Sequence, residues 1–179
     1  ALGACAHRQA ASEPQGRPSR DFQPLAVGNE WTYTGRMMGQ PVERTLRLVA
    51  VEDGYYVYDD EGRSRLKHDD LGLRDEKRYL LQHPVEKGRS WSSIVSVSST
   101  ERYEIVDTGF NCQSPAGRFT DCVKVRATNR IDPQRQFRME WTYAPGVGQV
   151  RLSFAVLEGD RELPQGELEL QRYQVQPRP

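Results

Sequence analysis

The sequence predicts an all-β fold, an antiparallel up-and-down meander that forms a curved half-barrel or open barrel of about ten strands. Short segments rich in Val, Tyr, Thr, Ile and Trp alternate from Asp21 onward with turn residues, about every 8–12 residues. No long window carries the apolar stripe of an amphipathic helix. The chain has 179 residues, which fits one domain, and we place that domain at residues 21–179.

The expected strands follow one another with short connections, which favours a meander that curls to bury its apolar face. Apolar and polar residues alternate at 46–51 and at 94–97, so that one face would be buried and the other solvated. Asp53-Gly54 and Pro145-Gly146 are examples of the turn signals between strands. The strands are expected at residues 30–37, 43–51, 55–58, 63–68, 79–83, 91–97, 101–106, 122–129, 137–143, 150–154 and 168–175.

One tetrapeptide, Glu-Trp-Thr-Tyr, occurs twice, at residues 30–33 and 140–143. In each copy Trp and Tyr lie two residues apart and therefore share one strand face. Two interpretations stay open: these are core strands, or the aromatic residues line a concave apolar ligand surface. The candidate ligand-lining residues are Trp31, Tyr33, Tyr56, Tyr58, Trp91, Tyr103, Trp141 and Tyr143.

Residues 2–5, Leu-Gly-Ala-Cys, resemble the lipobox at which bacterial signal peptides are cleaved and the cysteine is acylated. The charged and apolar regions of such a signal peptide would precede residue 1. We expect Cys5 to carry lipid, including palmitate, and residues 1–20 to be the lipobox and a flexible tether, since 7–20 are rich in Ser, Gln, Pro, Arg and Gly. The alternative is an unmodified N-terminus in a cytosolic protein.

The other two cysteines, Cys112 and Cys122, form an even pair. Residues 114–117, Ser-Pro-Ala-Gly, have type I turn chemistry that would place the cysteines across a hairpin. A disulfide there would contribute about 2.5–3 kcal/mol in an oxidising compartment. Two buried free thiols are the alternative, whereas a zinc site would need four ligands.

Composition and motifs argue against several functions. Lys+Arg and Asp+Glu are equal at 25 each, which disfavours nucleic acid as a partner. No apolar run approaches the ~18 residues of a membrane helix. His68 and His83 have no second His at ligand spacing, so we predict no catalytic residue, no metal and no cofactor. The carboxylates at 59–61 and 69–70 are expected in solvated turns, and a hydrolase that uses them is the third alternative.

Three landmarks stand in order along the chain: PLAVGNEW at 24–31, PAGRFTDC at 115–122 and YAPGVGQV at 143–150. Together they resemble a group of secreted bacterial lipoproteins with no established activity. At the level of fold, the pattern is also similar to the half-barrel carriers of lipoprotein sorting, which hold acyl chains in a concave apolar face.

These observations predict a lipid-anchored envelope module without catalytic activity that holds an apolar ligand in its concave face. The alternative is a structural subunit that binds another envelope protein through a sheet edge. Ala6 stands where an Asp would retain a lipoprotein in the inner membrane. By resemblance to that sorting rule, the expected location in a Gram-negative cell is the periplasmic face of the outer membrane. In a Gram-positive cell it would be the outer face of the plasma membrane.

Overall fold

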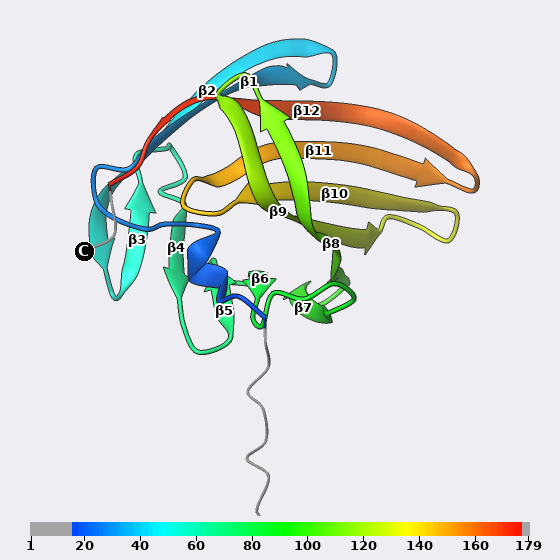
Figure 1. Ribbon diagram of the computed structural model, residues 1–179. Coiled ribbons are helices and arrows are strands. Elements are labelled where there is room, and N and C mark those ends of the chain that lie inside the picture. Colours follow the sequence, from blue (N-terminus) through cyan, green and yellow to red (C-terminus); the bar gives the residue numbers. More distant parts are fainter. Residues whose placement is uncertain (1–15, 177–179) are drawn as a thin grey trace, which may run out of the picture.

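Twelve antiparallel strands and one short 3-10 helix make up the described part of the computed structural model, residues 16–176 (Figure 1). The elements are η1 (Ser19–Asp21), β1 (Glu30–Met37), β2 (Gln40–Glu52), β3 (Tyr55–Tyr58), β4 (Arg65–His68), β5 (Gly72–Arg74), β6 (Tyr79–Gln82), β7 (Ser90–Ser96), β8 (Ser99–Ser114), β9 (Gly117–Arg130), β10 (Arg135–Ala144), β11 (Gly148–Glu158) and β12 (Arg161–Gln174). The predicted all-β meander is confirmed, with twelve strands where about ten were expected.

One sheet contains every strand, in the order β6-β5-β4-β3-β2-β1-β12-β11-β10-β9-β8-β7. Except for β6 and β7, strands that are consecutive in sequence pair with each other, and the first and last strands, β1 and β12, also pair. The sheet curls into a nearly closed barrel (Figure 1). Its two edges, β6 and β7, are consecutive in sequence but share no ladder, which leaves one unsealed seam.

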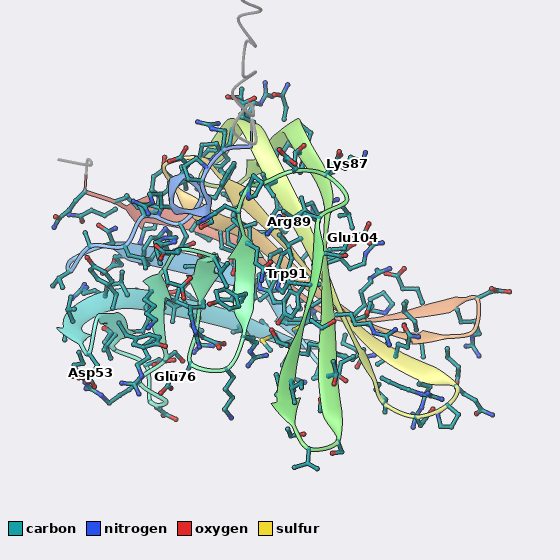
Figure 2. All side chains as sticks on the ribbon, turned by 90° about the horizontal axis from the view of Figure 1, so that it is seen from below. Asp53, Glu76, Lys87, Arg89, Trp91 and Glu104 are labelled. Atoms are coloured by element: carbon teal, nitrogen blue, oxygen red, sulfur yellow. A yellow bond between two sulfur atoms is a disulfide. The ribbon has the colours of Figure 1, made fainter. Side chains whose placement is uncertain are left out.

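Side chains bridge this seam. The indole N–H of Trp91 on β7 donates a hydrogen bond of 2.8 Å to the carbonyl of Tyr79 on β6. Arg78, one residue before β6, forms an ion pair of 3.0 Å with Glu101 on β8. Figure 2 looks toward β7 and labels Arg89, Trp91 and Glu104 along this part of the barrel. The seam is thus closed by side chains where the backbone ladder is missing.

Several strands are longer than the sequence predicted, and β5 was not predicted at all. β8 and β9 extend well beyond the expected 101–106 and 122–129, up to the predicted turn at residues 114–117. β5 has only three residues, too few for an alternating pattern. It lies close to β6 because Gly72 has no side chain: an added Cβ would lie 2.2 Å from the carbonyl oxygen of Leu81.

The N-terminal part of the described chain covers one end of the barrel. Arg17 forms a bridge with Val85, and the carbonyl of Asp21 accepts a hydrogen bond from the backbone N–H of Gly146. The predicted tether therefore reaches the folded part before residue 21, because Arg17 bridges Val85 and Ser19 is buried. Residues 1–15, including most of the predicted tether, lie outside the described residues.

Candidate functional site

A groove lies where the end of the β8–β9 hairpin crosses the neighbouring strands. Gly109 and Asp121 both have positive φ, 73° and 56°, and the β8–β9 register shifts between Thr108 and Phe110. β9 stops pairing with β10 at Val123, so the rest of the hairpin is free to bend over β10–β12 (Figure 1). Its tip is held there because the N–H of Ala116 donates a 3.0 Å hydrogen bond to the carbonyl of Leu170 on β12.

The disulfide between Cys112 and Cys122 connects the two strands of this crossing hairpin, with 6.1 Å between the Cα atoms. The cysteine pairing predicted from the turn chemistry is therefore confirmed. Cys122 is fully buried and packs in the same apolar cluster as Val150 and Leu168. The disulfide holds the hairpin as one unit over the strands beneath it.

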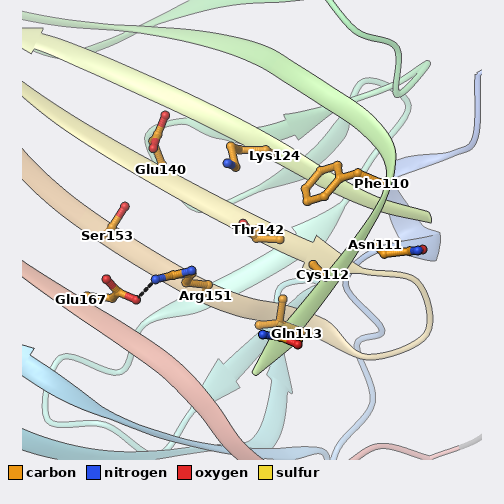
Figure 3. Close-up of a pocket in the computed structure, with 11 residues that line it drawn as sticks. Phe110, Asn111, Cys112, Gln113, Lys124, Glu140, Thr142, Arg151, Ser153 and Glu167 are labelled. Carbon is orange, nitrogen blue, oxygen red and sulfur yellow. Dashed lines mark hydrogen bonds and ion pairs between the residues drawn. The ribbon is translucent and has the colours of Figure 1, made fainter. Parts of the chain in front are cut away.

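The groove under the hairpin has a volume of about 420 Å³ (Figure 3). Its lining residues on the strands alternate with core residues: Thr142 and Arg151 face the groove, whereas Trp141 and Leu152 face the interior. The full lining consists of Phe110, Asn111, Cys112 and Gln113 of β8, Lys124 of β9, Glu140 and Thr142 of β10, Val150, Arg151 and Ser153 of β11, and Glu167 of β12.

Most charges in the groove are paired. Arg151 pairs with Glu167 and lies 3.8 Å from Glu169, while Glu140 accepts a 2.8 Å hydrogen bond from Arg126. Lys124 is different: its ammonium lies 5.8 Å from the centre of the Phe110 ring, and no carboxylate of the described residues lies within ion-pair distance. The groove therefore contains one cation whose charge is not matched by a direct partner.

Four lining side chains are polar and neutral: Asn111, Gln113, Thr142 and Ser153. Within residues 16–176 none of these side chains forms a hydrogen bond to another residue. The hydroxyl and amide groups can each donate and accept hydrogen bonds. Thr142 is 6% exposed as a whole residue and lines the groove. The arrangement suits a polar ligand more than an apolar one.

The aromatic residues predicted as ligand-lining are mostly core residues. Trp31, Tyr33, Tyr58, Tyr103, Trp141 and Tyr143 are each less than a tenth exposed, whereas Tyr56 and Trp91 are half-buried. Trp91, Tyr103 and Trp141 form a stack, with ring centres 5.4 and 6.0 Å apart. These side chains fill the barrel themselves, so at these residues the described chain offers a packed interior in place of an open concave face.

The first tetrapeptide copy is hydrogen-bonded to the segment that follows the second copy. Trp31 Nε1 donates a 2.7 Å hydrogen bond to the carbonyl of Val147, and the Tyr33 hydroxyl donates a 2.9 Å bond to that of Gln149. Both acceptors lie just after the second copy. Burial, reinforced by the neighbouring phenols of Tyr58 and Tyr143, raises the pKa of Tyr33 well above its ordinary value. Such buried neutral phenols act as structural donors.

The acidic segments occupy turns, as the sequence predicts. Asp60 accepts hydrogen bonds from the N–H and hydroxyl of Ser64, and Asp69 accepts them from the N–H groups of Leu71 and Gly72. Within residues 16–176, no group of three or more His, Cys, Asp or Glu residues is placed to hold a metal ion. No helix in the same range is long and apolar enough to cross a membrane.

His68 and His83, which were considered as metal ligands, do not line this groove. His68 Nε2 lies 2.8 Å from the carbonyl of Gln23, beside a second pocket of about 310 Å³ that Tyr56 also lines. His83 lies just after β6. Cys5, the predicted lipid attachment site, lies outside the described residues.

The residues of the groove were not singled out from the sequence. Lys124, Thr142 and Arg151 look like ordinary outward-facing strand residues, because alternation says which face a side chain occupies but not what covers that face. The cysteine hairpin was predicted, yet nothing local indicates that it bends across three further strands. The positive φ at Asp121 has no strong sequence signal either, since Asp is a common turn residue.

Comparison with known proteins finds a similar fold but no similar sequence. No protein-family model matches the chain, and no curated protein matches it either. A candidate exported protein of Bacteroides fragilis with a YmcC-like fold is similar in structure, with 14% identity, 86% of this chain and 98% of that chain covered, and a TM-score of 0.51. A candidate lipoprotein of Parabacteroides distasonis shows 15% identity, coverage of 86% and 99%, and a TM-score of 0.44. At such identities the likeness concerns the fold alone.

Proposed function

We propose that the chain is a lipid-anchored envelope protein that acts as a binding module without catalysis, with the groove under the β8–β9 hairpin as its binding site. The observation that carries the proposal is the disulfide-held hairpin over a polar groove. Structural disulfides persist in oxidising compartments, which supports a location outside the cytoplasm. The groove volume of about 420 Å³ is in the range of small-molecule sites.

The anchor is the second part of the proposal. Cys5 follows Leu2, Gly3 and Ala4 in the order of a lipobox, and the similar Bacteroides fragilis structure is described as a candidate exported protein. Ala6 in place of Asp supports the periplasmic face of the outer membrane as the location in a Gram-negative cell. The tether between Cys5 and Gly16 would then hold the barrel at a root-mean-square distance of about 20 Å from the membrane anchor.

Three other functions have less support from the structure. An apolar ligand in the barrel would compete with Trp31, Tyr103 and Trp141, which already occupy the interior. A partner strand would have to add to β6 or β7, the two edges of the sheet. These edges face each other across the seam, where Trp91 already donates a hydrogen bond to the Tyr79 carbonyl. A carboxylate hydrolase would need acidic residues that now hold turns, such as Asp60 and Asp69.

Fractionation of the native envelope tests the proposal. We expect the wild-type protein in the membrane fraction, from which detergent and not high salt releases it, and Cys5→Ala in the soluble fraction. The double variant C112A/C122A is the matched control, because it removes two cysteines but keeps the acylation site, and it should stay membrane-bound. Equal membrane association of wild type and Cys5→Ala would overturn the anchor.

A further inference from the structure

We propose that the groove binds an acidic saccharide, with the Lys124 ammonium as counter-ion to a sugar carboxylate. This inference rests on the proposed binding function and names its ligand class. It is built on the unpaired ammonium of Lys124, on the neutral polar side chains that line the same groove, and on the pairing of the strands beneath.

One lining cation, Lys124, has no carboxylate of residues 16–176 within ion-pair distance. Arg151 is engaged by Glu167, and Glu140 is engaged by Arg126. Asp107 stands opposite Lys124 in the β8–β9 ladder, but its carboxylate pairs with Lys87 at 3.3 Å. Lys124 thus remains the lining cation that a ligand carboxylate can neutralise.

The neutral lining suits hydroxyl groups on the ligand. Asn111, Gln113, Thr142 and Ser153 surround the groove and form no side-chain hydrogen bond within residues 16–176. Each can donate to and accept from a sugar hydroxyl, which is itself both donor and acceptor. Phe110 adds one aromatic ring, which can pack against the C–H face of a pyranose.

Other anions fit the groove less well. A phosphate prefers the two-pronged guanidinium of Arg or several backbone N–H groups, but Arg151 is engaged and the backbone of β10 and β11 is paired on both sides. An acidic peptide binding as an added strand needs a free edge. The strands under the groove have none, and the open edge of the crossing hairpin presents the neutral side chains of Asn111 and Gln113. A single carboxylate on a hydroxyl-rich scaffold satisfies both the lysine and the neutral side chains.

Isothermal titration of the full chain with three uronate oligosaccharides of different linkage tests the inference: trigalacturonate, trimannuronate and a hyaluronan tetrasaccharide. We expect at least one to bind, with affinity that falls as salt rises. Lys124→Gln should weaken that binding at least tenfold. Lys77→Gln, on the turn between β5 and β6, is the matched control and should leave it unchanged. The methyl ester of the binding oligosaccharide, which has no charge, should also bind at least tenfold more weakly.

The readout is completed by amide chemical shifts, which should change at Thr142 and Ser153 on binding. Failure of all three uronates to bind, or equal binding by Lys124→Gln, would overturn the inference. Inorganic phosphate and a triglutamate peptide are the competing probes. If either binds through Lys124 and the uronates do not, the saccharide class is wrong while the binding function survives. Membrane anchoring is tested separately with Cys5→Ala, so a failure of the anchor can be distinguished from a failure of saccharide binding.

Discussion

The indole of Trp91 and the backbone carbonyl of Tyr79 connect the two strands at which the sheet would otherwise end. Their 2.8 Å hydrogen bond spans β7 and β6, and Trp91 also stacks on Tyr103 in the core. Unpaired edge strands invite pairing with other chains. Here a single side chain satisfies an edge carbonyl and fixes the seam to the core at once.

Replacing Trp91 by Phe should therefore weaken the seam locally. The variant keeps a ring on Tyr103 but leaves the Tyr79 carbonyl without its donor, which costs about 1–2 kcal/mol of the free energy of unfolding. Urea unfolding measures the loss, and hydrogen exchange should become faster in β6 and β7 before other strands. Ser92→Ala, on the exposed face of β7, is the control. Unchanged exchange in β6 would contradict the bridging role.

Arg78 and Glu101 form the second seam contact. The Glu101 side chain is 7% exposed and also accepts a hydrogen bond from the Tyr103 hydroxyl. Glu101→Gln removes the buried partner of Arg78 but leaves Asp75, 2.9 Å from the same guanidinium, and should cost about 1–2 kcal/mol. The double variant R78M/E101L should lose clearly less than the sum of R78M and E101L in urea unfolding. Additive losses would show that the two residues do not act as a pair.

The disulfide should contribute measurably to stability. Its closed loop predicts a loss of about 2.5–3 kcal/mol in C112A/C122A, measured by urea unfolding. Hydrogen exchange should increase mainly at residues 110–122, because the tip hydrogen bond from Ala116 to Leu170 then depends on the hairpin alone. The intact protein in reductant should behave like the double variant. A loss below about 0.5 kcal/mol would contradict this role.

The lowered pKa of Asp69 predicts that the folded protein loses stability in acid. Burial alone would raise its pKa, but hydrogen bonds from the N–H of Leu71, the Tyr79 hydroxyl and the N–H of Gly72, with the Arg74 charge, outweigh it and hold the pKa below the ordinary 3.8. Its stabilisation is therefore present above the unfolded-state pKa and is lost as the pH falls through the lower folded-state pKa.

Comparing urea midpoints at pH 7 and pH 3 measures this effect. Wild type should lose more stability between the two conditions than Asp69→Asn. Tyr79→Phe, which removes one donor to the carboxylate, should show an intermediate loss. Identical pH dependence in wild type and Asp69→Asn would remove Asp69 from the account of acid sensitivity.

Local patterns predicted much of the fold. Alternation and turn residues located the hairpins, and the chemistry of residues 114–117 predicted the cysteine pairing that the structure confirms. They did not predict β5 or the full length of β8, because three residues carry no alternation and Gly109 interrupts it. Strand bounds also depend on partners that lie far away in sequence.

The candidate site was harder to predict. Trp31 and Trp141 attracted attention because aromatic residues bind ligands, yet aromatic residues also fill cores, and a strand pattern is the same in both cases. The distinguishing fact is what lies on the other side of the barrel. Lys124 shows the converse: its role depends on a hairpin that crosses from residues 107–122, which no local pattern around Lys124 indicates.

Intact mass spectrometry of the protein from its native envelope, with and without reductant, tests the central claim most directly. We predict a chain that begins at Cys5, carries an acylated glyceryl group and gains about two daltons on reduction as Cys112 and Cys122 become thiols. An unmodified Cys5 together with no mass change on reduction would contradict both the anchor and the oxidising compartment on which the proposed function depends.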